Sequence, residues 1–598
     1  MRRSDDAWNT KGNDLFKLGK YEEAIDCYDN ALDRDPGDAD ALCSKGRALK
    51  ELGKYQDAIG CYNKALERNP KDADAWTHAG LSLKALGKFE ASTGCYDKAI
   101  EINPKSGEAW TNKGVALTEL GNYEGAVVCY TTALGINPKN ATAWYNKGVT
   151  LVRLGRYEEA LECYEKVLAA DSRDADAWYN RGVVFGELGK PQEALVCYDK
   201  ALEINPKNAS AWYNKGVTLR ELGKSGEAIG CYDTALGLDP REVYAWLNRG
   251  LALKELGKFE DACESCDRAL AINPEIGAAW TCKGIALKEL GKYEEAIGCF
   301  DQALNRDPGD ADAWYTKGVA LGKLGRYEET LECYDKALAI NPGSSDAWNN
   351  KGNGLYKLGR YEEAIGCYYQ ALLINPGLGG TWNNKGVALK ELGDYEEAIA
   401  CYDKALETDP ELLGAWLNKG VALKELEKYE EAVACFDTAL GINPGISKAW
   451  YNKGVAYGEL GKPQLAIACY QKVLEQNPED VDAWYNKAVT LKELGSYEEA
   501  VACYRHVLER DPGDVDAWYN MGVSLKELGK YKEAIQCYNK SLEIDPRDAY
   551  AWTSKGVALK ELGRREEALV CFDRALEINP RLAGAWNNKK VALKELGK

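Results

Sequence analysis

Hydrophobic and polar residues recur along this chain with a fixed period of 34 residues. Tryptophan sets the register, because Trp8, Trp76 and Trp110 begin a series that continues at this spacing to Trp586 and is interrupted only by Leu42. We number the positions of each repeat from 1 to 34, with Trp at position 4. A strict period of this length predicts a repeat array in which each unit buries its apolar face against its neighbours.

Each repeat predicts two helices. Apolar residues at positions 3, 4, 10, 11 and 14 form one helical stripe, and those at 20, 21, 24, 27 and 28 form a second. Glycine at position 15, as in Gly53 and Gly257, predicts a left-handed cap that ends the first helix. Position 17 opens the second helix; it is usually Tyr, and Pro191 and Pro463 stand there in two repeats. A proline near position 32 ends this helix.

Glycine also recurs at position 8, in the middle of the first helix. It runs from Gly12 to Gly556, with Ala488 the only exception inside the array. Glycine in a helix interior costs about 1 kcal/mol relative to alanine. Its recurrence therefore predicts a close approach of the second helix, with the small residue at position 20, such as Ala24, facing it.

These residues resemble the tetratricopeptide repeat family, which has a signature of spaced Trp, Gly, Leu, Ala, aromatic, Ala and Pro residues. One repeat matches it with Trp110, Gly114, Leu117, Ala126, Tyr130, Ala133 and Pro138. The resemblance implies an all-α protein, a right-handed α-α superhelix of about 17.5 repeats. We expect one continuous array over residues 1–598, with 17 full repeats in residues 5–582 and a terminal capping helix in 583–598.

Position 7 departs from the family pattern, which usually has leucine there. This chain has a cation instead, for example Lys113 and Arg181. We expect each cation to bury its aliphatic stem and to extend its charged head to water or to a carboxylate.

Two repeats carry weaker core residues. Ser92 and Thr93 replace an Ala–Ile pair in the third repeat, and Cys266 takes an aromatic position in the eighth. We expect Cys266 to leave a gap and a softer repeat.

Composition excludes several classes of function. A net charge of −18 and a pI near 5.0 argue against binding to nucleic acid or to an anionic membrane surface. No apolar run is long enough to span a membrane, and the first residues do not resemble a signal peptide. We therefore expect a cytoplasmic protein.

Most of the 20 cysteines follow a lattice of their own, from Cys27 to Cys571 with a gap at Ser265. Neighbouring helices pack about 8–10 Å apart, whereas a disulfide needs Cα atoms within about 7 Å. We expect unpaired thiols that act as small, partly buried hydrophobic residues.

The sequence offers little for catalysis. It contains only two histidines, His78 and His506, and Cys263-x-x-Cys266 has no matching second pair. The glycines follow the helix lattice rather than a phosphate-binding loop. We therefore predict no enzymatic activity, no metal site and no cofactor.

The first helices of the family line a concave face, and position 6 of this face is asparagine in 12 of the 18 units. Such a row resembles the asparagine ladder in the repeat domain of O-linked N-acetylglucosamine transferases, which implies binding of an extended peptide. The alternative is that these amides bridge neighbouring helices. The carboxylate clamp of the family is incomplete: Asn13 and Asn353 fit it, but Asn9 and Asn349 stand where lysine is needed.

Tyrosine precedes this asparagine in two runs of three consecutive repeats. The candidate peptide-binding residues are Tyr145, Asn146, Tyr179, Asn180, Tyr213 and Asn214 in the first run, and Tyr451, Asn452, Tyr485, Asn486, Tyr519 and Asn520 in the second. Tyrosine gives a large contact area at a low cost in conformational entropy. It could instead simply pack against the next helix.

We therefore predict a scaffold that binds extended or disordered segments of other proteins in its groove. Two alternatives stay open. One is a targeting or regulatory subunit of a protein-modifying enzyme carried on another chain, and the other is a self-associating structural solenoid.

Overall fold

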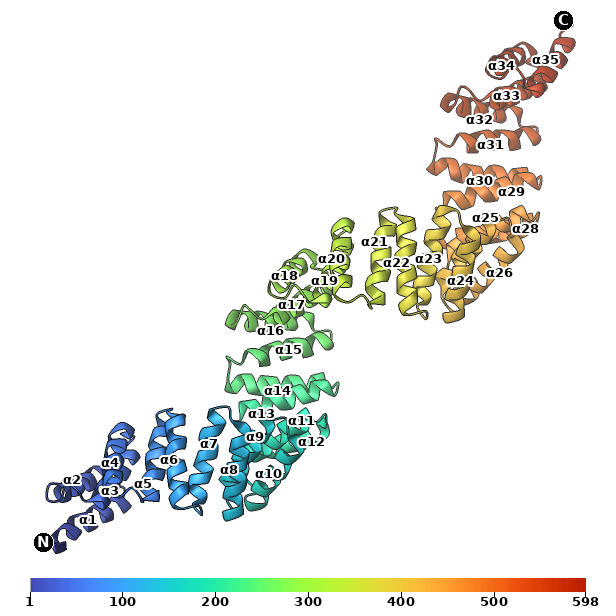
Figure 1. The fold of residues 1–598 in the computed structure, drawn as a ribbon. Helices are drawn as coiled ribbons and strands as arrows, with labels where there is room; N and C mark the ends of the chain where they lie inside the picture. The colour runs from blue at the N-terminus through green and yellow to red at the C-terminus, as the bar shows by residue number, and fades with distance from the viewer. Residues whose placement is uncertain (1, 598) are drawn as a thin grey trace. The chain divides into compact units, whose positions relative to one another are not determined.

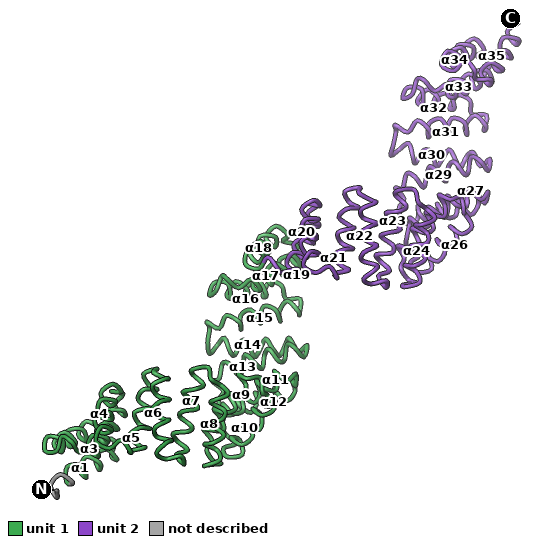
Figure 2. Tube along the Cα trace, viewed as in Figure 1, with its two compact units in different colours: residues 1–307 green, residues 308–598 purple. Residues whose placement is uncertain are grey.

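The computed structural model describes residues 2–597 and gives side-chain surroundings for residues 7–597. Within residues 2–597 it contains 35 α-helices and no strand, which confirms the predicted all-α class (Figure 1). The chain divides into two compact units, residues 1–307 and 308–598 (Figure 2). We describe each unit by itself, and their function as one continuous array stays a prediction.

The first unit contains eighteen helices. They are α1 (Arg2–Lys17), α2 (Tyr21–Leu32), α3 (Ala39–Glu51), α4 (Tyr55–Arg68), α5 (Ala73–Ala85), α6 (Phe89–Ile102), α7 (Gly107–Glu119), α8 (Tyr123–Ile136), α9 (Ala141–Arg153), α10 (Tyr157–Ala170), α11 (Ala175–Glu187), α12 (Pro191–Ile204), α13 (Ala209–Glu221), α14 (Ser225–Leu238), α15 (Val243–Glu255), α16 (Phe259–Ile272), α17 (Gly277–Glu289) and α18 (Tyr293–Arg306).

The second unit continues the same alternation. Its helices are α19 (Ala311–Lys323), α20 (Tyr327–Ile340), α21 (Ser345–Lys357), α22 (Tyr361–Ile374), α23 (Gly379–Leu392), α24 (Tyr395–Thr408), α25 (Leu413–Glu425), α26 (Tyr429–Ile442), α27 (Ser447–Glu459), α28 (Pro463–Gln476), α29 (Val481–Glu493), α30 (Tyr497–Arg510), α31 (Val515–Glu527), α32 (Tyr531–Ile544), α33 (Ala549–Glu561), α34 (Arg565–Ile578) and α35 (Ala583–Glu595).

In both units each odd-numbered helix packs against the even-numbered helix that follows it, and consecutive pairs stack in chain order. The turn inside each pair is made by the glycine at position 15. Gly53 and Gly257 have φ of 73° and 72°, so the predicted left-handed cap is confirmed. Glu427 takes the same conformation with φ of 59°, which costs a non-glycine residue roughly 1–2 kcal/mol. Pro191 and Pro463 begin their helices, as predicted.

The glycine at position 8 lies against the aromatic ring at position 24 of the same repeat. A Cβ atom placed on Gly12 would lie 2.6 Å from Cε1 of Tyr28, and one on Gly284 would lie 2.7 Å from Cε1 of Phe300. The predicted close approach is confirmed, but the neighbour is the ring and not the alanine at position 20. Because these rings are almost fully buried, glycine is what lets them enter the space between the two helices.

The cation at position 7 reaches a carboxylate at position 25 of the preceding repeat. Lys113 Nζ lies 2.5 Å from Asp97 Oδ1 and 5.6 Å from the centre of the Trp110 ring. The expectation of a buried stem and a carboxylate partner is therefore confirmed. The same pairing occurs in Lys45–Asp29, Lys215–Asp199, Arg249–Asp233, Lys283–Asp267, Lys351–Asp335, Lys419–Asp403, Lys453–Asp437 and Lys589–Asp573.

The eighth repeat closes around Cys266 instead of leaving the expected gap. Cys266 is fully buried and packs in one cluster with Leu247 and Cys282. Helix α17 also packs more extensively against α15 than the corresponding first helices do elsewhere. The missing aromatic bulk is thus replaced by a closer approach of the neighbouring first helices.

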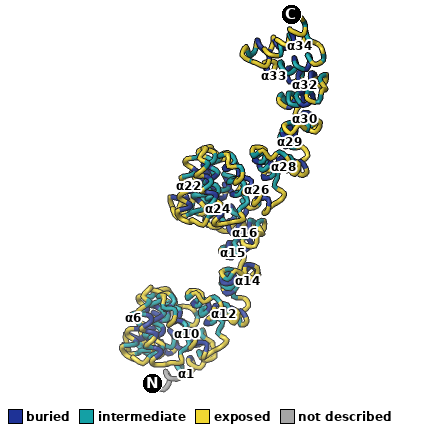
Figure 3. Tube along the Cα trace, turned by 90° about the vertical axis from the view of Figure 1, so that its right-hand side faces the viewer, coloured by how far each residue is buried: buried dark blue, intermediate teal, exposed yellow. Residues whose placement is uncertain are grey.

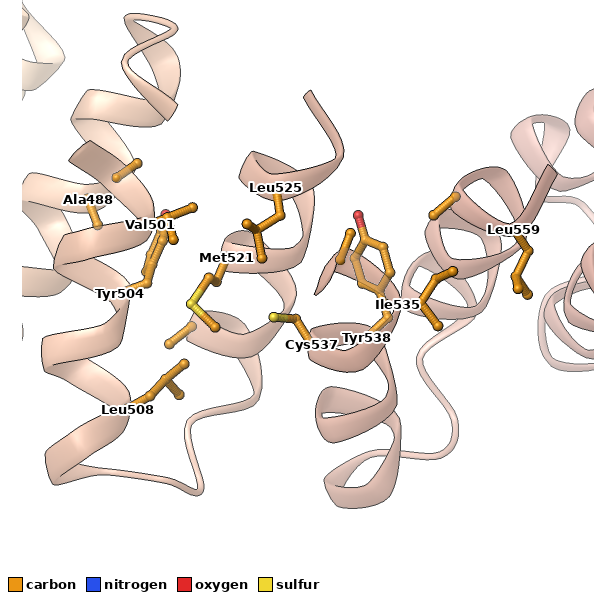
Figure 4. Close-up of a cluster of buried hydrophobic side chains, with 14 of the residues drawn as sticks. Ala488, Val501, Tyr504, Leu508, Met521, Leu525, Ile535, Cys537, Tyr538 and Leu559 are labelled. Atoms are coloured by element: carbon orange, nitrogen blue, oxygen red, sulfur yellow. The ribbon is translucent and has the colours of Figure 1, made fainter. Parts of the chain in front are cut away.

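The core runs from repeat to repeat inside each unit. In Figure 3, buried residues follow the interior of the helix stacks and exposed residues follow the turns. Figure 4 shows one stretch of it, where Tyr504, Met521 and Tyr538 belong to one cluster of buried side chains from consecutive helices. Since the second helices supply most large buried rings, part of each first helix remains exposed and can serve as a surface.

Candidate functional site

The first predicted triplet lies on three consecutive first helices, α9, α11 and α13. Tyr145, Tyr179 and Tyr213 are each partly exposed. Each ring lies on the buried tyrosine of its own repeat: the centres of the Tyr145 and Tyr164 rings are 6.1 Å apart. The exposed rings therefore have a fixed support beneath them, which limits the entropy that they lose on binding.

Each of these tyrosines is bonded to the asparagine of the next repeat. Asn180 Nδ2 donates to the Tyr145 hydroxyl at 3.0 Å, and Asn214 Nδ2 donates to the Tyr179 hydroxyl at 3.0 Å. Asn248 Nδ2 donates to the Tyr213 hydroxyl at 3.1 Å. The sequence pattern placed each tyrosine beside the asparagine of its own repeat, whereas the structure joins it to the asparagine 35 residues later.

The second triplet repeats this arrangement on α27, α29 and α31. Asn486 Nδ2 donates to the Tyr451 hydroxyl at 3.0 Å, and Asn520 Nδ2 donates to the Tyr485 hydroxyl at 3.3 Å. The last tyrosine of this run meets a serine instead of an asparagine: the Tyr519 hydroxyl lies 3.5 Å from Oγ of Ser554.

Two predicted asparagines lie outside these bridges. Asn146 follows a repeat with Thr111 at position 5, and in the described part of the chain it forms no hydrogen bond with a tyrosine hydroxyl. Asn452 is 8% exposed, and its Nδ2 donates to the Lys448 carbonyl oxygen at 2.8 Å. The structure therefore gives the least support to Asn146 and Asn452 among the predicted site residues.

Sequence reasoning missed one asparagine of the same kind, Asn248, and one complete pair, Tyr315 and Asn350. Asn248 receives no prediction because Leu247 precedes it, although it bonds Tyr213. Asn350 Nδ2 donates to the Tyr315 hydroxyl at 2.9 Å in a repeat where Thr316 follows the tyrosine. A search for Tyr and Asn separated by 35 residues would have found both.

Two of the bridging asparagines use their nitrogens and leave their oxygens open, whereas Asn520 Oδ1 accepts from Lys492 Nζ at 2.8 Å. Asn180 Nδ2 also donates to the Asp176 carbonyl oxygen at 2.8 Å, and Asn486 Nδ2 donates to the Asp482 carbonyl oxygen at 2.9 Å. Both N–H groups of each amide are therefore used, while its Oδ1 accepts no hydrogen bond from the side chains described. Each bridging tyrosine accepts through its oxygen and keeps its own proton to donate.

Burial keeps two tyrosines of the first triplet neutral. Burial, with a further contribution from Asp176, raises the pKa of Tyr145, and burial likewise raises the pKa of Tyr179. Tyr145, Thr142 and Asp176 line a hollow of about 280 Å³ on this surface. The surface can thus offer hydroxyl donors and amide acceptors side by side.

No group of three or more His, Cys, Asp or Glu side chains in the described part of the chain is arranged to hold a metal ion. All 20 cysteines are free thiols, most of them buried. Among the described helices, none is both long and apolar enough to cross a membrane.

Stacked helical hairpins with a partly exposed row of polar and aromatic side chains define an all-α repeat protein. The tetratricopeptide repeat family matches at residues 175–208, 243–276, 311–344, 345–378, 381–412, 414–445, 447–480, 515–548 and 549–582. Related descriptions of the same repeat match at 9–73, 43–91, 95–127, 114–155, 150–189, 197–230, 284–325, 469–502 and 490–529. The chain belongs to the tetratricopeptide repeat family, whose members are protein-interaction scaffolds.

Three solved structures illustrate the similarity. YrrB, described as a TPR protein with an unusual peptide-binding site, is 30% identical over 31% of this chain and 95% of its own, with a TM-score of 0.28. The Cut9–Hcn1 structure is 18% identical over 87% of this chain and 96% of that chain, with a TM-score of 0.32. The structure of Naa15/Naa10 bound to HypK is 16% identical over 100% and 97%, with a TM-score of 0.30. Among curated proteins, none matches this chain.

Proposed function

We propose that this protein is a non-enzymatic scaffold that binds extended or disordered segments of other proteins along its first helices. The observation that carries the proposal is the repeated tyrosine–asparagine bridge. It holds the Tyr145 and Asn180 side chains in fixed positions, yet leaves the tyrosine proton and the asparagine oxygen of this pair unused.

An extended peptide matches this surface chemically. Its backbone presents N–H and C=O groups at regular intervals, so N–H groups can donate to asparagine oxygens and carbonyl oxygens can accept from tyrosine hydroxyls. The rings add contact area without a large loss of side-chain entropy. Recognition of this kind depends mainly on the peptide backbone, so it suits unfolded segments of varied sequence.

The test compares two matched double variants. Peptides are first selected with the parent protein from a display library of random sequences, and dissociation constants are then measured by fluorescence anisotropy. Changing Asn180 and Asn214 to alanine should raise the dissociation constant more than tenfold, or about 1.4 kcal/mol. Affinity for the peptide should fall because each change removes a hydrogen-bond acceptor and breaks the bond that holds a tyrosine hydroxyl in place.

The control changes Asn384 and Asn418 to alanine. These asparagines also bridge neighbouring first helices, through Asn353 and Asn383, and within the described residues neither forms a hydrogen bond with a tyrosine. The control variant should bind the selected peptides as the parent does, and both variants should keep the parent's circular dichroism spectrum. Equal binding by all three proteins would place the peptide site elsewhere.

The two alternative functions predict different results. A self-associating solenoid gives a mass that rises with concentration in light scattering and selects no peptide. A targeting subunit co-purifies with an enzyme that remains bound through washing, and the Asn180 and Asn214 changes leave that association intact.

A further inference from the structure

A separate cavity of about 270 Å³ lies in the second unit, on the same surface of first helices. Lys323 from α19 and Lys357 from α21 contribute to its lining, together with Tyr334 from α20 and Asn353 from α21. None of these residues belongs to the two predicted tyrosine–asparagine triplets.

The two lysines reverse the charge that the rest of the second unit carries at this position. Position 13 is glutamate in every other repeat of the unit: Glu391, Glu425, Glu459, Glu493, Glu527, Glu561 and Glu595. In four of these repeats a lysine at position 12 pairs with this glutamate, namely Lys390–Glu391, Lys424–Glu425, Lys526–Glu527 and Lys560–Glu561.

In the two cavity repeats this internal pairing is absent. Position 12 is Gly322 in one repeat and Tyr356 in the other, and the cation stands at position 13. Both Lys323 and Lys357 are exposed, and neither forms an ion pair with a side chain of the described region. Two ammonium groups therefore face solvent at one place on a chain of net charge −18.

Two glycines are among the residues that line the cavity. A Cβ atom placed on Gly322 would lie 3.7 Å from Thr330, and one placed on Gly354, where most repeats have alanine, would lie 3.3 Å from Leu331 Cδ2. Tyr334 is 3% exposed, and its hydroxyl bonds to no side chain in the described region. Burial raises the pKa of Tyr334, so this hydroxyl is a neutral donor at the cavity wall.

We propose that this cavity binds the carboxylates of an acidic segment of a partner protein. The ammonium groups of Lys323 and Lys357 would pair with two carboxylates, and the Tyr334 hydroxyl would donate to one of them. The proposal extends the proposed peptide-binding function to a second stretch of the same surface, and so rests on it. The lysines stand at position 13, and not at positions 5 and 2 that the carboxylate clamp of the family uses.

The spacing favours a peptide over a small anion. Lys323 and Lys357 come from consecutive first helices, and packed helices lie about 8–10 Å apart. An extended chain crosses that distance in about three residues, at roughly 3.3 Å per residue. Lysine acts as a point charge without the planar fork with which arginine holds phosphate, so two separated carboxylates are the better fit.

The experiment uses the full chain and a fluorescein-labelled hexaglutamate peptide, with labelled hexaglutamine for comparison. Anisotropy at low salt should detect binding of hexaglutamate only. The double variant Lys323→Glu/Lys357→Glu should bind it at least tenfold more weakly, and Lys323→Gln/Lys357→Gln should fall between this variant and the parent.

The matched control is Lys472→Glu/Lys540→Glu. It changes the net charge by the same amount at exposed lysines that form pairs with Glu475 and Glu543 on second helices. This control should bind hexaglutamate nearly as the parent does. The Asn180→Ala/Asn214→Ala variant should also retain it, which separates failure of this proposal from failure of the proposed function.

Three results would overturn the proposal. The parent protein could fail to bind hexaglutamate, or the Lys323→Glu/Lys357→Glu variant could bind no more weakly than the control. Inorganic phosphate could also displace the peptide at the same concentration as free hexaglutamate, which would indicate a small-anion site. Thermal melting of each variant checks that the changes leave the fold intact.

Discussion

At the scale of single residues, the glycine at position 8 is required by one neighbouring ring and not by backbone geometry. A Cβ atom on Gly352 would lie 2.6 Å from Cε1 of Tyr368, closer than real contacts allow. Ala488 occupies the corresponding place beside Tyr504, so a neighbouring ring can shift enough to admit a methyl group. The substitution should therefore be costly but not prohibitive.

The eleventh repeat offers a matched pair for this test. Gly352→Ala should destabilise the protein by about 1–3 kcal/mol through overpacking. Gly366 lies in helix α22 of the same repeat with no atom within 4 Å of an added Cβ, so Gly366→Ala should stabilise it by roughly 0.5–1 kcal/mol. Urea unfolding of both variants measures the difference. Similar shifts of the same sign would contradict the ring-contact explanation.

His78 is a second residue with a measurable effect. It takes the position that most repeats fill with asparagine, and its Nδ1 is buried without a hydrogen-bond partner. Burial, and then the nearby Lys50 and Arg47, lower the pKa of His78 to about 4. The folded state therefore favours the neutral ring, whereas the unfolded chain protonates near pH 6.5.

The sign of the pH dependence follows from that shift. The neutral ring contributes its full stability above pH 6.5, and this contribution is lost as the pH falls from 6.5 toward 4, by at most about 1.4 kcal/mol per pH unit. His78→Asn removes the titrating group. The parent should lose more apparent unfolding free energy than this variant between pH 7 and pH 5, as measured by urea unfolding. Parallel losses would mean that His78 is not held neutral.

At the scale of helices, the sequence predicted what depends on local chemistry. Helix ends depend on the backbone preferences of single residues, such as Gly257 with its left-handed conformation and Pro191 at the start of its helix. The same holds for the cation at position 7. A long polar side chain on an apolar stripe must carry its charge outward, and Lys113 does so.

The pairing of side chains between helices was not predictable in the same way. Asn146 follows Tyr145 in sequence, but adjacent residues on a helix do not face each other. The residue that meets Tyr145 is Asn180, because the stacking of neighbouring repeats brings positions 5 and 6 together. That register depends on how the helices pack, which no single repeat encodes.

The replacement of glutamate by lysine at position 13 can be read from the sequence, but its structural consequence cannot. The charge of Lys323 is visible in the repeat alignment. Only the structure adds that Gly322, Gly354 and Tyr334 line a cavity beside it. The site therefore required both the pattern and the packing.

Two second helices carry unusual residues at core positions. In α6, the Ser92 hydroxyl donates to the Phe89 carbonyl oxygen at 2.8 Å, and the Thr93 hydroxyl donates to the Glu90 carbonyl oxygen at 2.7 Å. Such bonds compete with the helical pattern. In α16, Cys266 replaces a large aromatic ring. The neighbouring Ser265 adds no apolar bulk, and its Oγ accepts a hydrogen bond from Arg249 Nη1 at 2.6 Å.

At the scale of the molecule, a repeat protein has no single core, because each repeat packs only on its neighbours. Local defects should therefore appear as local loss of stability. We expect backbone amides in α6 and α16 to exchange with solvent faster than those in α24, where Ala398 and Tyr402 keep the usual small and aromatic residues. Hydrogen exchange measured by mass spectrometry can resolve these segments.

A repair variant makes this last prediction specific. Ser92→Ala/Thr93→Ile introduces the Ala–Ile pair that eight of the 17 full repeats carry and removes both hydroxyl bonds to the helix backbone. Exchange in α6 should then slow toward the rate of α24, whereas α16 lies many repeats away in the stack and should not change. Because stability in such an array is a sum of local terms, repair should act locally. Uniform protection in the parent, or slowing in α16 as well, would show that the helices unfold together instead.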